Sequence, residues 1–203
     1  MAQPYVHRII FVRHGQTSYN AENRLQGQRD VPLDGKGREQ AGAVGRYLRD
    51  HLGEEMARLN AAGAFWASPL ARTCQTMELA RVAMGLAPRP YRLDARLKEL
   101  TFGDWEGLNW EEIAARDRRG VEAREADKWN FRPPRGESYA DLAARVSSWL
   151  DERDGDTLVV AHGGVARVLM TLVAGVAQPV AAGASIAQGR VLIFDRSAFS
   201  WVG

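Results

Sequence analysis

The stretch Ile9-Ile10-Phe11-Val12-Arg13-His14-Gly15 places a basic side chain and a histidine directly behind a short apolar run. The β-branched and aromatic run predicts a buried strand over residues 8–13. Ligands of open α/β sheets collect at strand ends, and a glycine lets the backbone turn sharply and approach a ligand closely. The position of His14 therefore predicts a functional site at the end of this strand.

The chain repeats this pattern once. Leu158-Val159-Val160-Ala161 leads into His162-Gly163-Gly164. If the two strands are parallel neighbours, about 4.8 Å apart, both imidazoles open into one pocket. Two histidines and the adjacent Arg13 predict a site for an anion, above all for a phosphoryl group.

Apolar periodicity elsewhere predicts strands that alternate with helices. This order is typical of an α/β fold with a largely parallel sheet covered on both faces. Residues 1–203 are expected to form one domain, with a cap or lid at about 104–136, where residues 119–136 are rich in arginine. Predicted helices cover 35–51 (capped by Asp34), 68–84, 109–118, 138–150 and 164–174; predicted strands cover 64–67, part of 89–108, 157–161, 184–187 and 190–194.

Composition limits the possible functions. The 203 residues carry a net charge of only +2, and no basic run or aromatic-interleaved patch is present, so nucleic acid is not an expected partner. Cys74 is the only cysteine, which excludes an intramolecular disulfide and a cysteine-rich zinc site. No apolar stretch reaches the ~18 residues of a membrane helix, and the N-terminus lacks a signal-peptide pattern. We expect a cytoplasmic protein without a membrane partner.

Phosphoryl transfer needs a nucleophile, positive charge around the phosphoryl oxygens and a proton donor for the leaving group. A neutral His14 can be the nucleophile, with a main-chain carbonyl holding its other N–H. Arg72 falls in the first turn of the helix expected to begin at Ser68-Pro69. A cation there is disfavoured by about 0.3–1 kcal/mol, so an anion is expected to bind at that helix end.

His162 is predicted to be a second donor to the phosphoryl oxygens, and free N–H groups of Gly163-Gly164 could add to the same anion hole. Glu99 lies among apolar residues, which favour a protonated carboxyl and hence a general acid. Spacing alone does not separate Glu99 from three other carboxylates, Glu106, Glu111 and Glu112.

Other phosphatase chemistries lack their motifs. Cys74 has no arginine behind it to form a phosphate loop, and no Asp-x-Asp nucleophile, clustered metal ligands or Walker-type glycine loop is present. We therefore expect neither a metal nor a cofactor.

Six ordered blocks of this chain, spread over about residues 8–196, resemble the signature of the histidine phosphatase superfamily, which has the phosphoglycerate-mutase-like fold. The resemblance implies a three-layer α/β/α sandwich with a mixed, mostly parallel central sheet. It also implies that His14 is phosphorylated during turnover and that Glu99 is the proton donor. The remaining implied site residues are Arg13, Arg72 and His162 around the phosphoryl group, and Asn20 and the Gln26-Gly27 backbone in the same pocket. The blocks are Arg13–Asn20, Leu25–Gly27 with Asp30–Leu33, Ser68–Thr76, Leu97–Glu99 with Phe102–Gly107, Gly136–Ser138 and Ala161–Gly164.

Members of this superfamily either hydrolyse phosphomonoesters or isomerise phosphoglycerate. Cofactor-dependent mutases carry a longer insertion that encloses the substrate, whereas only 63 positions separate Glu99 from His162 here. A shorter lid leaves the phosphohistidine open to water. The prediction is a metal-independent phosphomonoester hydrolase for a small phosphorylated metabolite; a phosphoglycerate mutase and a non-catalytic phosphate-binding protein are the alternatives.

Two further expectations concern surfaces. The apolar region 165–187 could supply a homodimer contact. The lid arginines could select an anionic substrate, although a solvated charged surface is the commoner role of such residues; they are Arg116, Arg118, Arg119, Arg124, Arg132 and Arg135.

Overall fold

The centre of the protein is a six-stranded sheet with the order β3-β2-β4-β1-β5-β6. The structure, a computed structural model, describes residues 7–195 and 198–202. The first four strands in this order pair in parallel, whereas β5 and β6 are antiparallel, so the predicted mixed, mostly parallel sheet is confirmed. The strands are β1 (Arg8–Arg13), β2 (Phe65–Ala67), β3 (Arg92–Leu93), β4 (Thr157–Ala161), β5 (Val191–Asp195) and β6 (Ala198–Val202).

The two strands that carry the histidines are parallel neighbours, as predicted. Arg13 at the end of β1 lies opposite Ala161 at the end of β4. The backbone N–H of His14 continues the ladder by donating to the carbonyl of Ala161 at 3.0 Å. Both histidines therefore follow the carboxyl ends of two adjacent strands, on the same side of the sheet.

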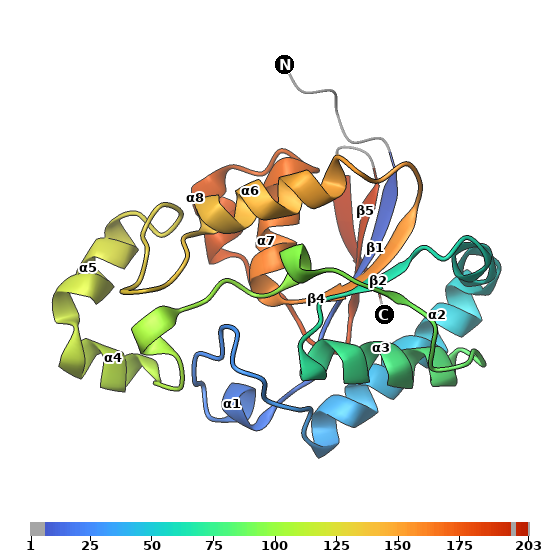
Figure 1. Ribbon diagram of the computed structural model, residues 1–203, viewed down its shortest axis with the longest axis horizontal. Helices are drawn as coiled ribbons and strands as arrows, with labels where there is room; N and C mark the ends of the chain where they lie inside the picture. The colour runs from blue at the N-terminus through green and yellow to red at the C-terminus, as the bar shows by residue number, and fades with distance from the viewer. Residues whose placement is uncertain (1–6, 196–197, 203) are drawn as a thin grey trace.

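Helices cover both faces of the sheet, which confirms the three-layer α/β/α sandwich (Figure 1). Successive side chains of a strand point to opposite faces. Phe11 packs toward α6, α7 and α8, whereas Ile10 and Val12 pack toward α2 and α3. These helices are α2 (Gly35–Ala61), α3 (Ala71–Ala83), α6 (Tyr139–Leu150), α7 (Gly163–Leu172) and α8 (Gln178–Gly183).

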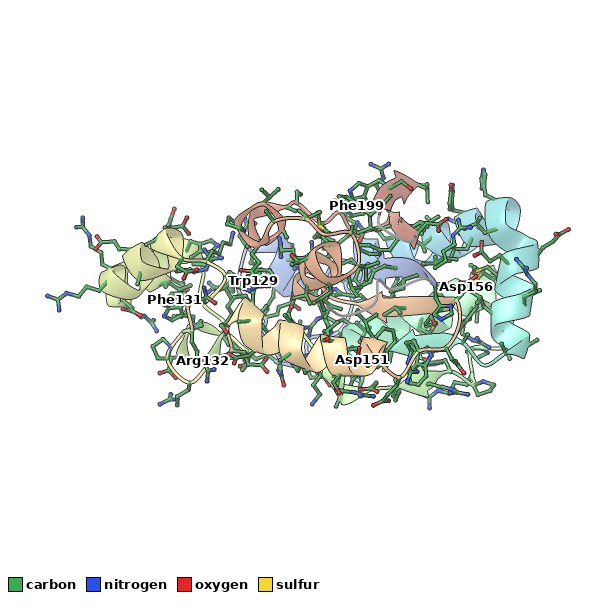
Figure 2. All side chains as sticks on the ribbon, turned by 90° about the horizontal axis from the view of Figure 1, so that it is seen from above. Trp129, Phe131, Arg132, Asp151, Asp156 and Phe199 are labelled. Carbon is green, nitrogen blue, oxygen red and sulfur yellow. The ribbon has the colours of Figure 1, made fainter. Side chains whose placement is uncertain are left out.

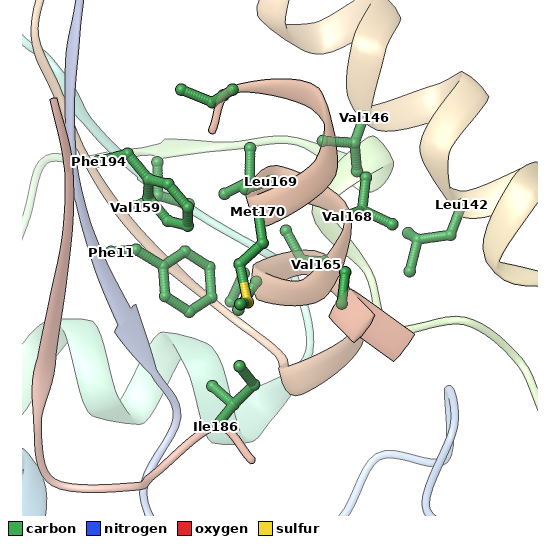
Figure 3. Packing of buried hydrophobic residues seen from close by; sticks show 14 of the residues in the cluster. Phe11, Leu142, Val146, Val159, Val165, Val168, Leu169, Met170, Ile186 and Phe194 are labelled. Atoms are coloured by element: carbon green, nitrogen blue, oxygen red, sulfur yellow. The ribbon is translucent and has the colours of Figure 1, made fainter. Parts of the chain in front are cut away.

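Helix α7, which begins directly after His162, lies between the sheet and α6 (Figure 3). Leu169 and Met170 lie toward Phe11 of the sheet, while Val168 lies toward Val146 of α6. Burying one such side chain stabilises the fold by about 1.5–3 kcal/mol. The helix that starts at the second histidine is thus held firmly on both sides.

Helix α2 is ten residues longer than the predicted 35–51, since it ends at Ala61. The predicted cap is confirmed, because the Asp34 side chain accepts the N–H of Gly37. At Leu52 the backbone leaves helical geometry, with φ −133° and ψ 23°. The helix resumes because its second part buries Met56 and Leu59 in the core, a tertiary gain that local pattern did not indicate.

Helix α3 begins at Ala71, so the prediction of a helix start at Ser68-Pro69 was wrong. The Ser68 hydroxyl contacts His162 instead of capping the helix. The N–H of Ala71 donates to the carboxylate of Asp30 at 2.6 Å, so a carboxylate from a distant loop satisfies this helix end.

The C-terminal third also differs from prediction. Residues 184–187 are not a strand; α8 precedes them, and residues 184–190 form an irregular segment whose Ile186 carbonyl accepts a hydrogen bond from Arg13. The predicted strand at 190–194 is confirmed as β5, and β6 was not predicted.

A four-residue helix near the N-terminus, α1 (Ser18–Ala21), lies in the stretch 14–33, which was predicted as a loop.

The segment between Glu99 and α6 projects away from the sheet (Figure 1). It was predicted to be a cap separate from the core, but Trp129 is buried and stacks on Tyr139 of α6. Figure 2 shows Trp129 at the junction between the lid helices and α6. The extent of one domain over 1–203 with a lid at 104–136 stays a prediction. The short helices of this segment are η2 (Gly103–Trp105), α4 (Trp110–Arg116) and the unpredicted α5 (Arg118–Ala126), and η1 (Ala95–Leu97) lies just before Glu99.

The apolar region 165–187 is mostly internal. Val165, Val168 and Leu169 belong to the core, and exposed large apolar side chains in this region are Leu172 and Val180. The homodimer therefore stays a prediction with less apolar surface to support it. In the part of the chain that the structure describes, no helix combines the length and apolar character needed to cross a membrane.

Candidate active site

His14 is buried at the end of β1 with one ring nitrogen already bonded. Its Nδ1 lies 2.7 Å from the carbonyl oxygen of Gly15. A carbonyl can only accept, so Nδ1 carries the proton and Nε2 keeps its lone pair. Burial lowers the pKa of His14 well below its ordinary value, and the charges of Arg72 and Arg13 lower it further. The ring is therefore neutral at physiological pH and nucleophilic at Nε2.

His162 lies beside it in a different setting. The two ring centroids are 5.2 Å apart. His162 Nε2 lies 2.8 Å from the Ser68 hydroxyl, and its Nδ1 is buried without a hydrogen-bond partner. Among the described residues the Ser68 hydroxyl has no other acceptor for its proton, so it donates to Nε2 and Nδ1 carries the ring proton. Burial, followed by the charge of Arg72, lowers the pKa of His162 well below its ordinary value.

Two guanidinium groups adjoin this histidine pair. Arg72 is 1 % exposed; its two terminal nitrogens donate to the carbonyls of Arg29 and Gly27 at 2.8 and 2.7 Å. Arg13 donates one terminal nitrogen to the carbonyl of Ile186 at 2.6 Å. Burial lowers the pKa of Arg72 to about 10, so it remains cationic at neutral pH.

The Nε atoms of Arg13 and Arg72 and the Nδ1 of His162 share a property. Each is buried and has no hydrogen-bond partner in the described part of the chain. A buried donor left unpaired costs about 1–3 kcal/mol. Three such donors around one neutral imidazole form a site that an oxyanion would complete.

Glu99 reaches the same place from the loop after η1. Its carboxylate accepts the N–H of Gly164, at the start of α7, at 3.1 Å. A side chain at residue 164 would collide with that carboxylate, because a Cβ there would lie 2.1 Å from Glu99 Oε1. The expectation that both glycine N–H groups are free for an anion is therefore wrong for Gly164, which binds Glu99.

The residues expected around the phosphate pocket are also brought together. Asn20 and Gln26 are tied through Thr17, whose hydroxyl donates to Gln26 at 2.9 Å. Gly27 has a φ of +52°, which favours glycine, and its carbonyl holds Arg72. With Gly163, these residues line a pocket of about 160 Å³ that also contains Arg13, His14, Arg72 and Glu99.

The lid arginines do not line this pocket, which agrees with the commoner role of a solvated charged surface rather than with selection of an anionic substrate. Arg118, Arg132 and Arg135 form ion pairs with nearby carboxylates at the surface. The basic residues that sequence reasoning missed are Arg24 and Arg167, which do line it. Arg167 could have been found from spacing, because it lies four residues after Gly163 and so on the same face of α7.

The site thus holds a nucleophilic imidazole, oxyanion donors and a carboxyl group within one pocket. These are the groups that transfer of a phosphoryl group to a side chain requires. Within residues 7–195 and 198–202, no group of three or more His, Cys, Asp or Glu side chains is arranged to hold a metal ion.

A family model for the histidine phosphatase superfamily (branch 1) matches residues 9–202. The chain belongs to this superfamily. Glucosyl-3-phosphoglycerate phosphatase of Mycobacterium tuberculosis is 35% identical over 175 residues, which cover 80% of this chain and 73% of that protein. A solved structure of mycobacterial glucosyl-3-phosphoglycerate phosphatase with VO3 superposes with a TM-score of 0.76 at 28% identity, covering 97% of this chain and 96% of that one.

Mutases of the superfamily are similar to the same extent. The 2,3-bisphosphoglycerate-dependent phosphoglycerate mutase of Methylobacterium radiotolerans is 32% identical over 198 residues, which cover 94% of this chain and 90% of its own length. A mutase of comparable length therefore exists, so a short chain by itself does not separate a hydrolase from a mutase.

Proposed function

We propose that this protein is a metal-independent phosphomonoester hydrolase that acts on a small phosphorylated metabolite through a phosphohistidine. The observation that carries the proposal is the state of His14. Its Nδ1 is taken by the Gly15 carbonyl, its ring is neutral, and Arg13, Arg72 and His162 offer unpaired donors around it. Guanidinium groups supply the positive charge that phosphoryl transfer requires.

In the first step, the lone pair of His14 Nε2 forms a bond to phosphorus while the bond from phosphorus to the ester oxygen breaks. Arg13, Arg72 and His162 Nδ1 donate to the phosphoryl oxygens. Glu99, in its protonated form, gives its proton to the departing alcohol oxygen. The products are a neutral alcohol, a phosphorylated His14 and the Glu99 carboxylate.

In the second step, a water oxygen forms the new bond to phosphorus and the P–N bond breaks. The Glu99 carboxylate accepts the proton that this water loses. Inorganic phosphate leaves, and His14 returns to its neutral form with Nε2 free. One ester bond is hydrolysed and every group in the site is restored.

Two further basic residues in the pocket lining support a substrate with a second anionic group. Arg167 lines the pocket and donates to the Ala184 carbonyl and, at 3.3 Å, to the Tyr139 hydroxyl. Arg24 also lines it, but its charge is compensated by Glu112. Arg167 can therefore bind a carboxylate or a second phosphate of the substrate.

Hydrolysis is preferred over isomerisation because phosphatases are among the relatives both in sequence and in solved structure. The similar mutase keeps the mutase as the second candidate. A non-catalytic phosphate-binding protein is the third, although a neutral, preoriented imidazole is not needed for binding alone.

One assay distinguishes these functions. The purified protein is incubated with 3-phosphoglycerate, with and without 2,3-bisphosphoglycerate, and with a panel of phosphomonoesters that includes glucosyl-3-phosphoglycerate and neutral-alcohol phosphates. Phosphate release should exceed isomerisation, and doubly anionic substrates should have the highest kcat/KM. Faster isomerisation would establish the mutase, and the absence of both reactions would favour the binding protein.

A further inference from the structure

Glu99 projects from a segment with little regular structure of its own. After η1 ends at Leu97, no helix or strand covers residues 98–102. A proton donor must nevertheless be held within hydrogen-bond reach of the leaving oxygen. Something outside this segment has to fix the backbone from which the carboxyl projects.

That contact comes from Arg145 on α6. Its Nη1 donates to the carbonyls of Arg96 and Lys98 at 2.6 and 2.7 Å. Its Nη2 donates to the carbonyl of Glu99 itself at 3.0 Å. One guanidinium therefore holds three carbonyls of the segment that ends at the proton donor.

Glu137 completes the arrangement from the other side. Both of its carboxylate oxygens accept from Arg145, at 3.2 and 3.0 Å, so the pair is bidentate. The same carboxylate accepts the N–H of Thr101 at 3.1 Å, and the N–H of Glu137 donates to the Thr101 carbonyl at 2.8 Å. The backbone is thus held immediately before and after Glu99.

The Arg145–Glu137 pair is only partly buried, with side chains 18% and 25% exposed. A plain ion pair at such a position contributes little to stability, because water screens the two charges. Five further hydrogen bonds join these two residues to the backbone of residues 96, 98, 99 and 101, on both sides of the Glu99 side chain. These contacts are concentrated on the backbone that carries the proposed proton donor, whose position the reaction must fix.

We infer that Arg145, held by Glu137, is a positioning residue that sets the place of the Glu99 carboxyl and so controls protonation of the leaving group. The inference rests on the proposed function. It differs from a structural role in α6 because it connects Arg145 to one chemical step. A residue that only stabilises the fold would affect all substrates alike.

The experiment compares two esters with different needs for a general acid. An alkyl phosphate such as glycerol 3-phosphate has a poor leaving group, whereas p-nitrophenyl phosphate has a good one that departs with little protonation. Values of kcat/KM are used because they report the steps up to departure of the leaving group. Arg145→Gln should lower kcat/KM for the alkyl phosphate by about 100-fold and for the aryl phosphate by less than about 5-fold.

Three further single variants and one double variant, Arg145→Gln with Glu99→Gln, keep the test decisive. Glu99→Gln should reproduce the same dependence on leaving group, and Arg145→Gln should add less than about 3-fold to the loss already caused by Glu99→Gln. Arg145→Lys keeps the positive charge but loses the planar, two-nitrogen donor group. Its kcat/KM for the alkyl phosphate should therefore lie between those of Arg145→Gln and the wild type. If Arg145→Gln does not fold, Glu137→Gln tests the same contact while keeping the guanidinium.

Arg96→Gln is the matched control. Arg96 ties the same segment to α6, through the Ser148 carbonyl at 3.1 Å, and to Glu152, but makes no bond to residues 98–101. It should lower the melting temperature without dependence on leaving group. Equal losses on both esters in Arg145→Gln, or full additivity with Glu99→Gln, would overturn the inference. A wild-type protein that hydrolyses neither ester would overturn the proposed function, and the inference with it.

Discussion

His14 and His162 end two neighbouring parallel strands and are each followed by glycine, yet the structure leaves a different nitrogen free in each ring. In His14 a main-chain carbonyl takes Nδ1, so Nε2 has a lone pair. In His162 the Ser68 hydroxyl takes Nε2, so Nδ1 is the donor. The same local pattern thus produces a nucleophile and an oxyanion donor, because the partner of each ring decides its tautomer.

The largest expected effect comes from His14, the nucleophilic member of the pair. His14→Ala should lower kcat for phosphate release by about 10⁴-fold or more, since no other group can form the covalent intermediate. After incubation with a ³²P-labelled substrate and an alkaline SDS quench, the wild-type protein should carry label and His14→Ala should carry none. The variant should still unfold cooperatively, as followed by circular dichroism; an unchanged rate would remove His14 from this role.

His162→Ala removes a donor but leaves the nucleophile in place. The expected loss in kcat is about 10²–10³-fold, the range found when one oxyanion donor is removed. Labelled phosphohistidine should still accumulate, only more slowly, in a rapid-quench experiment. If the His162 variant lost labelling as completely as the His14 variant, the two roles assigned to the pair would be wrong.

Ser68→Ala tests the contact that makes the second ring a donor. Without the hydroxyl, the proton of His162 can move to Nε2, and kcat should fall by about 10-fold. Nitrogen-15 NMR of the imidazoles should show a changed tautomer for His162 and an unchanged one for His14. A matched Thr73→Val variant removes a buried hydroxyl of the same region that bonds only to carbonyls, and should leave both rings unchanged.

The smallest effect concerns stability, where the two histidines should behave alike. Burial holds both folded-state pKa values well below the unfolded value, so the unfolded chain binds protons that the folded one does not. Stability is therefore present above the unfolded pKa of about 6.5 and is lost as pH falls below it, by about 1.4 kcal/mol per pH unit for each histidine. Urea unfolding of wild type and His14→Ala between pH 7 and 5 should show a shallower slope for the variant; equal slopes would contradict a neutral, buried His14.

Much of the fold could be predicted from local pattern. The apolar runs at β1 and β4, the Asp34 cap and the alternation of strands with helices all depend on residues close in sequence. Errors occurred where distant contacts override local signals. Ser68-Pro69 has the features of a helix start, but Ser68 bonds to His162, and the helix begins at Ala71 against Asp30.

The site shows the same division. The motifs brought His14, His162, Arg13, Arg72 and Glu99 forward, and the structure places all of them around one pocket or beside it. The missed residues were Arg24, Arg167 and Arg145, ordinary arginines in an arginine-rich chain. Their roles depend on which carbonyls they bind and which cavity they line, and residues close in sequence do not indicate either.

Local chemistry along the chain was sufficient to specify two strand–histidine–glycine elements and the helices between them, because backbone preference and apolar periodicity act over a few residues. Packing was needed to decide which ring nitrogen is free, where α3 begins and what holds the proton donor. The contact between Ser68 and His162 spans 94 positions, and the contacts of Arg145 with the Glu99 segment span 46 to 49. Hydrogen bonds of that range form only once the sheet and its covering helices have brought the partners together.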